Sequence, residues 1–370
     1  MAVPDFESLA QPGIRRLRAY DPGHDIVALR AAFGCALLEM GSNENAWGTS
    51  PAALAAFQRC AAYLHRYPDP LGAPLKRALA DHLGLSPAQL MLGNGSHELL
   101  MMIAQAFAGP GASVVAAQFG FAVYALAAQA AGAEFAQAPA LPMRSAMSRG
   151  HDLAALAAAI TTTTRLVYIA NPNNPTGTWI PSGQLDAFLA ALPAGVLAVV
   201  DEAYIEYSTE AALCSAVSLL ERHANLIVTR TFSKAHGLAG LRVGYACAHP
   251  ELLRVLERLR ESFNVNSAGL AACAASLADS AHLLQVRENN ALERTWLAGQ
   301  LRGLGFAVAP SQTNFLLADT GRDASALEAA LVGRGIVLRP MAGYGLRDCL
   351  RITVGTRRDN ELLVAALTQA

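Results

Sequence analysis

LVYIANPNNPTG (166–177), VLAVVDEAY (196–204) and LIVTRTFSK (226–234) share one pattern, in which a short apolar run ends in a polar loop. Segments rich in alanine and leucine, which favour helices, separate the three runs. Strands that alternate with helices in this way predict a mostly parallel sheet covered by helices. Because ligands bind beyond the carboxyl ends of such strands, we expect the three polar loops to converge on one site.

Two more apolar runs, at residues 113–117 and 241–246, extend the predicted sheet. After Arg254 the pattern becomes helical, and later segments suggest further elements. These are a long amphipathic stretch at 276–303 and strand-like runs at 313–318 and 335–339. The change of pattern predicts a second, smaller α/β lobe after the large sheet.

The segment before Gly41 has no clear strand pattern and is rich in turn-forming residues. We expect it to wrap over the site or to join the smaller lobe. The sequence therefore predicts a large domain over residues 41–265 and a small domain made of residues 1–40 with 266–370.

The composition argues against several classes of function. The chain has 370 residues with a formal net charge of -1, and it contains no block of lysine and arginine that could follow a nucleic-acid backbone. Its six cysteines form no CxxC pair, which argues against a zinc ribbon, a redox dithiol or a disulfide framework. We therefore expect no metal site and no nucleic-acid partner, and a reducing cytoplasm fits best.

The sequence also argues against export and against a membrane span. The first residues lack the continuous apolar core of a signal peptide. The stretch between Glu98 and Glu134 carries no charge, but Gly109-Pro110-Gly111 interrupts it. It is better interpreted as a helix, a turn, a buried strand and a second helix.

Lysine is scarce in this chain, which contains only Lys76 and Lys234. Lys234 lies in a polar loop directly after a predicted strand. A lysine withdrawn from water has a lowered pKa and can attack a carbonyl group, whereas a solvated lysine stays mostly protonated. Lys234 is therefore a candidate nucleophile, with a solvated surface lysine as the alternative.

Two further groups stand where a charged ligand could bind. Asp201 follows the apolar run 196–200, where a buried carboxylate needs a cationic partner such as a protonated pyridine nitrogen. A structural salt bridge or a cap is the alternative. The small residues of GNGSHE (93–98) precede an apolar helix, so backbone N–H groups there could bind an anion; an ordinary glycine turn capped by Ser96 is the alternative.

The chain resembles the histidinol-phosphate aminotransferase family from about Tyr20 to its C-terminus. Beside the loops quoted above, the resemblance rests on strings that stand in the family's order. These are GSNENAWGTSP (41–51), RYPD (66–69), GNGSHELL (93–100), TRTFSKAHGLAGLRVGY (229–245) and LRITVG (350–355). The resemblance implies the aspartate-aminotransferase-like fold and the cofactor pyridoxal 5'-phosphate.

The resemblance also implies a role for each matching residue. Lys234 would form the Schiff base with the cofactor and shuttle the proton, and Asp201 would pair with the pyridine nitrogen. Phe121 would stack on the pyridine ring, although core packing would suit it equally. The remaining cofactor contacts are Asn174 and Tyr204 at the ring hydroxyl, and Gly95, Ser96, His97, Thr231, Ser233 and Arg242 around the phosphate.

Contacts beyond the cofactor are implied in the same way. Tyr67 matches a residue that reaches the cofactor phosphate of the neighbouring subunit, which implies a homodimer with shared active sites. Arg351 matches the arginine that grips the carboxylate of glutamate, with a surface arginine as the alternative. Further implied substrate contacts are Tyr20, Asn45 and Arg339.

The implied reaction is reversible transfer of an amino group between histidinol phosphate and 2-oxoglutarate, a step of histidine biosynthesis. An aromatic amino-acid aminotransferase, a threonine-phosphate decarboxylase and a non-catalytic cofactor-binding module are the alternatives. The chain departs from the family pattern at Ala46-Trp47, where Pro-Tyr or a similar pair is common, and at His97, where an acidic residue is usual.

Overall fold

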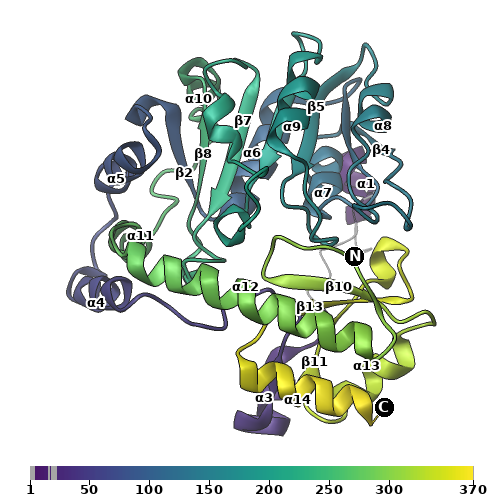
Figure 1. Cartoon of the computed structure of the whole chain (residues 1–370). Helices are drawn as coiled ribbons and strands as arrows, with labels where there is room; N and C mark the ends of the chain where they lie inside the picture. Colours follow the sequence, from purple (N-terminus) through teal and green to yellow (C-terminus); the bar gives the residue numbers. More distant parts are fainter. Residues whose placement is uncertain (1–4, 16, 18–22, 370) are drawn as a thin grey trace.

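A seven-stranded sheet forms the centre of the larger part of the molecule (Figure 1). The computed structural model describes residues 5–15, 17 and 23–369. The strand order is β2-β8-β7-β6-β5-β3-β4, and β8 alone runs antiparallel to its neighbours. The strands are β2 (Leu90–Gly93), β3 (Ser113–Ala117), β4 (Glu134–Ala138), β5 (Thr164–Ala170), β6 (Leu197–Asp201), β7 (Leu226–Thr231) and β8 (Gly244–Ala248).

Helices cover both faces of this sheet. One face packs with α4 (Pro51–Cys60), α5 (Ala73–Leu83), α8 (Leu153–Ala158), α9 (Ser182–Ala190) and α11 (Ser267–Ala278). The other face packs with α6 (Ser96–Phe107), α7 (Val123–Ala130) and α10 (Pro250–Leu256). The central strands β5, β6 and β7 are therefore buried on both sides, which explains their almost continuous apolar sequences.

A second, smaller body contains a four-stranded antiparallel sheet and a short parallel pair. The four strands are β12 (Arg339–Pro340), β13 (Cys349–Thr353), β10 (Phe315–Asp319) and β9 (Ala307–Val308), and the pair is β1 (Leu38–Glu39) with β11 (Ile336–Val337). The helices beside them are α12 (Ser280–Gly303), α13 (Ser325–Val332) and α14 (Arg357–Thr368). In Figure 1 the long α12 runs from the neighbourhood of α11 along the small sheet.

The described N-terminal residues contact both parts of the molecule. Helices α1 (Phe6–Leu9) and α2 (Pro12–Arg15) lie before α3 (Ile26–Phe33). α2 contacts α7 of the large part, whereas His24 hydrogen bonds to Glu328 of the small part. The assignment of this segment to the small lobe therefore stays a proposal. β1 adds a strand too short to leave a sequence pattern.

The division into domains at residues 41–265, and 1–40 with 266–370, stays a proposal. The helix α11 follows the proposed boundary, yet it packs against α4 and α5 and contributes Ala272 and Cys273 to the core of the large sheet. Among the described residues, no helix is both long enough and apolar enough to cross a membrane.

Candidate active site

A cleft of about 860 Å³ lies at the carboxyl ends of β5, β6 and β7. The three polar loops that follow these strands all line it, so their expected convergence is confirmed. Twelve of the predicted site residues line the cleft: Ser96, His97, Phe121, Asn174, Asp201, Tyr204, Thr231, Ser233, Lys234, Arg242, Arg339 and Arg351.

Lys234 extends its amine toward the loop that follows β1. Nζ donates to the carbonyl oxygens of Ser42 at 3.2 Å and Asn43 at 3.3 Å. Burial, with a smaller effect of the Arg351 charge, lowers the pKa of Lys234 to about 8. The other lysine, Lys76, forms an ion pair with Glu257 at 3.5 Å and does not line the cleft. Of the two lysines, Lys234 is therefore the one that lines the cleft and has the lowered pKa that a nucleophilic amine needs.

Asp201, at the end of β6, carries a buried carboxylate with one unused oxygen. The Tyr124 hydroxyl donates to Oδ2 at 3.0 Å, whereas Oδ1 has no hydrogen-bond partner. Burial raises the pKa of Asp201 to about 6, whereas donors near the carboxylate act in the opposite direction: first the Tyr124 hydroxyl, then the backbone N–H of Ala203 and the Thr229 hydroxyl. A buried carboxylate oxygen without a donor is costly, and a cationic N–H donor would remove that cost.

A cradle of small residues and donors lies at the start of α6. Gly95 has φ +82°, and a Cβ there would come within 2.6 Å of Arg242 Nη2. A Cβ on Gly244 would come within 2.4 Å of the backbone nitrogen of Ser96, the first residue of α6. These two glycines let a guanidinium and a helix N-terminus approach each other, which is an arrangement that binds anions.

Hydroxyl groups complete this cradle. Arg242 Nη1 donates to Ser233 Oγ at 3.2 Å, and the backbone N–H of Ser233 donates to Thr231 Oγ1 at 3.1 Å. His97, the second residue of α6, also lines the cleft, and burial together with the Arg242 charge lowers its pKa. A neutral imidazole adds no charge of its own to the cradle.

Two arginines of the small sheet line the opposite side of the cleft. Arg339 and Arg351 are directly paired across β12 and β13. Arg351 donates from Nη1 to Asn174 Oδ1 at 2.7 Å and from Nη2 to the Gly41 carbonyl at 2.6 Å. Both arginines line the cleft, so an anionic group of a ligand would find charged donors there.

Several predicted residues already have partners within the chain. The Tyr204 hydroxyl accepts from Asn43 Nδ2 at 2.9 Å. Asn45 does not line the cleft, and its Nδ2 donates to the carbonyl of Ala235 at 2.9 Å, which holds the loop beside Lys234. Tyr20 lies outside the described residues.

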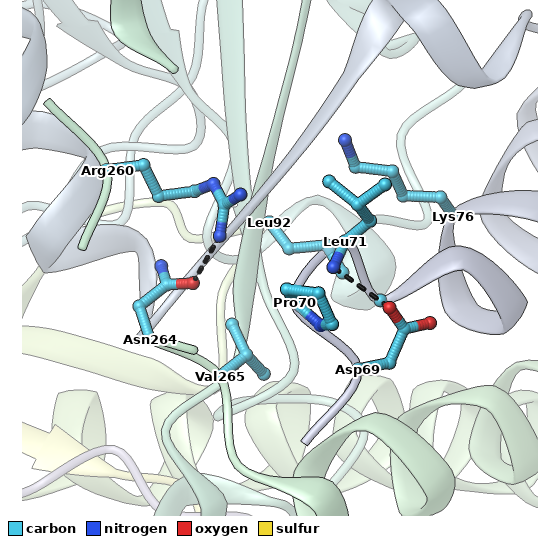
Figure 2. Close-up of a pocket in the computed structure, with 9 residues that line it drawn as sticks. Asp69, Pro70, Leu71, Lys76, Leu92, Arg260, Asn264 and Val265 are labelled. Atoms are coloured by element: carbon cyan, nitrogen blue, oxygen red, sulfur yellow. Dashed lines mark hydrogen bonds between the residues drawn. The ribbon is translucent and has the colours of Figure 1, made fainter. Parts of the chain in front are cut away.

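Tyr67 lies on the surface and away from the cleft of its own chain. Its side chain is 83% exposed, and its ring stacks on Phe263 at 4.7 Å between centroids. Figure 2 shows the small cavity beside this loop, between Asp69 and Asn264. Its volume of about 10 Å³ is room for roughly one water, so it is too small for a substrate.

Some cleft residues were missed by the sequence reasoning. Tyr124 contacts Asp201, and Tyr344 accepts from the backbone N–H of Ala122 at 3.2 Å. Tyr124 stands three residues after Phe121, but Phe121 precedes α7 (Val123–Ala130), so helical spacing gave no signal that would place both at the site. Within the part of the chain that the structure describes, no group of histidine, cysteine and acidic residues could hold a metal ion.

Comparison with known proteins agrees with this geometry. Residues 36–367 match the family described as aminotransferase class I and II. The chain is 45% identical to histidinol-phosphate aminotransferase 2 of Pseudomonas aeruginosa over 368 residues, which are 99% of this chain and 98% of that protein. It is 45% identical to the enzyme of the same name from Methylococcus capsulatus over 97% of each chain.

Solved structures show the same relationship. A histidinol-phosphate aminotransferase from Sinorhizobium meliloti in complex with pyridoxal-5'-phosphate is 34% identical, with a TM-score of 0.87 over 98% of this chain and 97% of that one. A mutant aspartate aminotransferase from Thermus thermophilus, 21% identical, shares the fold with a TM-score of 0.83 over 97% of this chain and 99% of that one. The predicted aspartate-aminotransferase-like fold is therefore confirmed, and this chain belongs to the class I and II aminotransferase family.

Proposed function

We propose that the chain is a histidinol-phosphate aminotransferase that uses pyridoxal 5'-phosphate to exchange an amino group between histidinol phosphate and 2-oxoglutarate. One observation supports this above the others: a lysine of lowered pKa and a buried carboxylate oxygen without a donor share one cleft. These are the two groups that the aldehyde and the pyridine nitrogen of this cofactor require.

The cleft residues fit the cofactor at each of its polar ends. Asp201 would pair with the ring nitrogen, and the α6 N-terminus with Ser233 and Arg242 would hold the phosphate. Phe121 would pack against the ring. When bound, the cofactor supplies an electron-withdrawing ring that stabilises negative charge on the substrate carbon. Lys234 would attach the cofactor and then move a proton at that carbon.

The choice of amino donor rests on the two paired arginines and on the relatives' names. A phosphate dianion calls for more donors than one guanidinium provides, and Arg339 beside Arg351 supplies them. An aromatic donor carries a single carboxylate. We therefore propose histidinol phosphate as the preferred donor.

The test is a half-reaction assay of the holoenzyme against histidinol phosphate, phenylalanine, tyrosine and threonine phosphate, followed in the cofactor absorbance. Histidinol phosphate should react with the highest kcat/KM. Arg339→Ala should weaken that donor by about 2 kcal/mol, roughly thirtyfold, and phenylalanine by less. Equal losses, or a wild-type preference for phenylalanine, would favour an aromatic aminotransferase, and release of carbon dioxide from threonine phosphate would favour a decarboxylase.

We also propose a homodimer with shared active sites in the cytoplasm. Tyr67 stacks on Phe263, and exposed apolar side chains near it in the sequence are Tyr63, Leu64 and Leu71. These five side chains are 38% to 83% exposed. An apolar surface of this kind is typical of a contact between proteins. The cytoplasmic location is supported by the five described free cysteines.

A further inference from the structure

We infer that the Tyr124 hydroxyl is a positioning group that orients Asp201, so that Oδ1 is the carboxylate oxygen offered to the ring nitrogen of the cofactor. This inference rests on the proposed cofactor chemistry. It assigns a role to a residue that contacts Asp201 from a different element of the fold, α7.

The contact itself uses one of the two carboxylate oxygens. The Tyr124 hydroxyl donates to Asp201 Oδ2 at 3.0 Å, and both side chains are buried. Among the described residues, Oδ1 has no partner in good hydrogen-bond geometry, although the Ala203 N–H and the Thr229 hydroxyl lie close enough to lower the pKa of Asp201. Both Tyr124 and Asp201 line the cleft. A carboxylate can rotate about its last bond, so a donor fixed on one oxygen also fixes the direction of the other. Tyr124 thereby leaves a single oxygen for a cationic ligand.

The ring of Tyr124 is held firmly enough to act in this way. It stacks on the Tyr168 ring at 4.8 Å between centroids with an interplanar angle of 4°. Phe121 contacts it edge-on, with centroids 5.9 Å apart. Aromatic pairs of these geometries are favourable beyond the area that they bury. These ring contacts therefore restrain the hydroxyl at Asp201.

Tyr168 offers a matched control for the hydroxyl. Its ring forms the other half of the stack, but its hydroxyl donates to the carbonyl of Leu100 at 2.8 Å and does not contact Asp201. Tyr124→Phe and Tyr168→Phe each remove one buried hydroxyl and keep the stacked ring. A merely structural role would give the two variants similar effects.

The experiment measures the dissociation constant of pyridoxal 5'-phosphate and its absorption spectrum on both variants. Tyr124→Phe should weaken cofactor binding about tenfold, because hydrogen bonds to charged groups contribute at least that much. It should also shift the cofactor absorption band and lower kcat with little change in the donor's KM. Tyr168→Phe should keep the wild-type spectrum and an affinity within about twofold.

A double-mutant cycle adds a second readout. In an Asp201→Asn background, Tyr124→Phe should change the affinity by less than about twofold, because its target is gone. The inference is overturned by equal weakening in both phenylalanine variants, by additive effects in the cycle, or by Tyr124→Phe failing to fold while Tyr168→Phe folds. A wild type that binds the cofactor but transaminates no donor would refute the proposed function alone, since the affinity comparison uses no donor.

Discussion

At the scale of single residues, Asp201 should make the cofactor-free protein sensitive to pH. Its pKa is raised from 3.8 to about 6 in the folded chain, so folding favours the protonated form. The corresponding stabilisation is complete below pH 3.8 and is lost as the pH rises through about 6, a difference of roughly 3 kcal/mol. Asp201→Asn should therefore stabilise the cofactor-free protein more at pH 7.5 than at pH 4.5, measured as the midpoint of urea unfolding.

Asp69 provides the control for that measurement. Hydrogen bonds, first from the backbone N–H of Leu71, lower the pKa of this exposed carboxyl group. Its contribution to stability is present above pH 3.8 and is lost only as the pH falls below it. Asp69→Asn should give no gain in stability at pH 7.5. A gain there equal to that of Asp201→Asn would show that burial of Asp201 is not the cause.

The sequence predicted the residues that stand directly at strand ends better than those that reach the site from elsewhere. Lys234 and Asp201 follow apolar strands, so their place at the cleft follows from the parallel sheet. Tyr124 reaches Asp201 across 77 positions of sequence, and no local pattern encodes such a pairing. Asn45 lies in a matching string, but its side-chain amide donates to the carbonyl of Ala235, beside Lys234, and does not line the cleft.

At the scale of secondary-structure elements, burial helped but did not by itself decide which strands could be predicted, because the fully buried β2 has only four residues and was missed. The run 113–117 coincides with β3, and β5 to β7 differ from their predictions by a few residues at the ends. β4 was missed because it is partly exposed and contains glutamate, glutamine and alanines. β8 begins at Gly244, later than predicted, because Arg242 adopts a positive φ of 54°.

The loop before α6 should tolerate no side chain at Gly95. Its φ of 82° and ψ of 160° lie in a region that glycine alone adopts readily, and a Cβ would displace Arg242. Gly95→Ala should therefore weaken binding of pyridoxal 5'-phosphate by about tenfold or more, which equilibrium titration of the cofactor-free protein would measure.

The variant Gly111→Ala is the control that distinguishes an effect of backbone strain from an effect of displacing Arg242 in the cradle. It has the same φ of 82°, but a Cβ there would meet no atom within 4 Å. Gly111→Ala should lower the unfolding midpoint and keep the cofactor affinity within about twofold. If both alanine variants lost affinity to the same extent, contact with Arg242 would not explain the effect at Gly95.

At the scale of the whole molecule, the exposed position of Tyr67 has a consequence for mixed assemblies. A Lys234→Ala subunit and a Tyr67→Ala subunit should each be nearly inactive alone. In a symmetric dimer with shared sites, random mixing should restore roughly a quarter of the sites. Activity should therefore rise when the two variants are mixed. No rise on mixing, or a fully active wild-type monomer, would contradict the shared site.

The presence of Arg339 and Arg351 in the lining of one cleft has a practical consequence for anyone who assays this protein. Guanidiniums in a cleft that accepts a phosphorylated donor should also bind small inorganic oxyanions from the buffer. In phosphate or sulfate solution the apparent KM for a phosphorylated donor should rise in proportion to the anion concentration, while kcat stays constant. Kinetics in matched phosphate and chloride solutions of equal ionic strength would measure this. A KM that depends only on ionic strength would show that salt screening of charges weakens donor binding, and that anions bound at Arg339 and Arg351 do not.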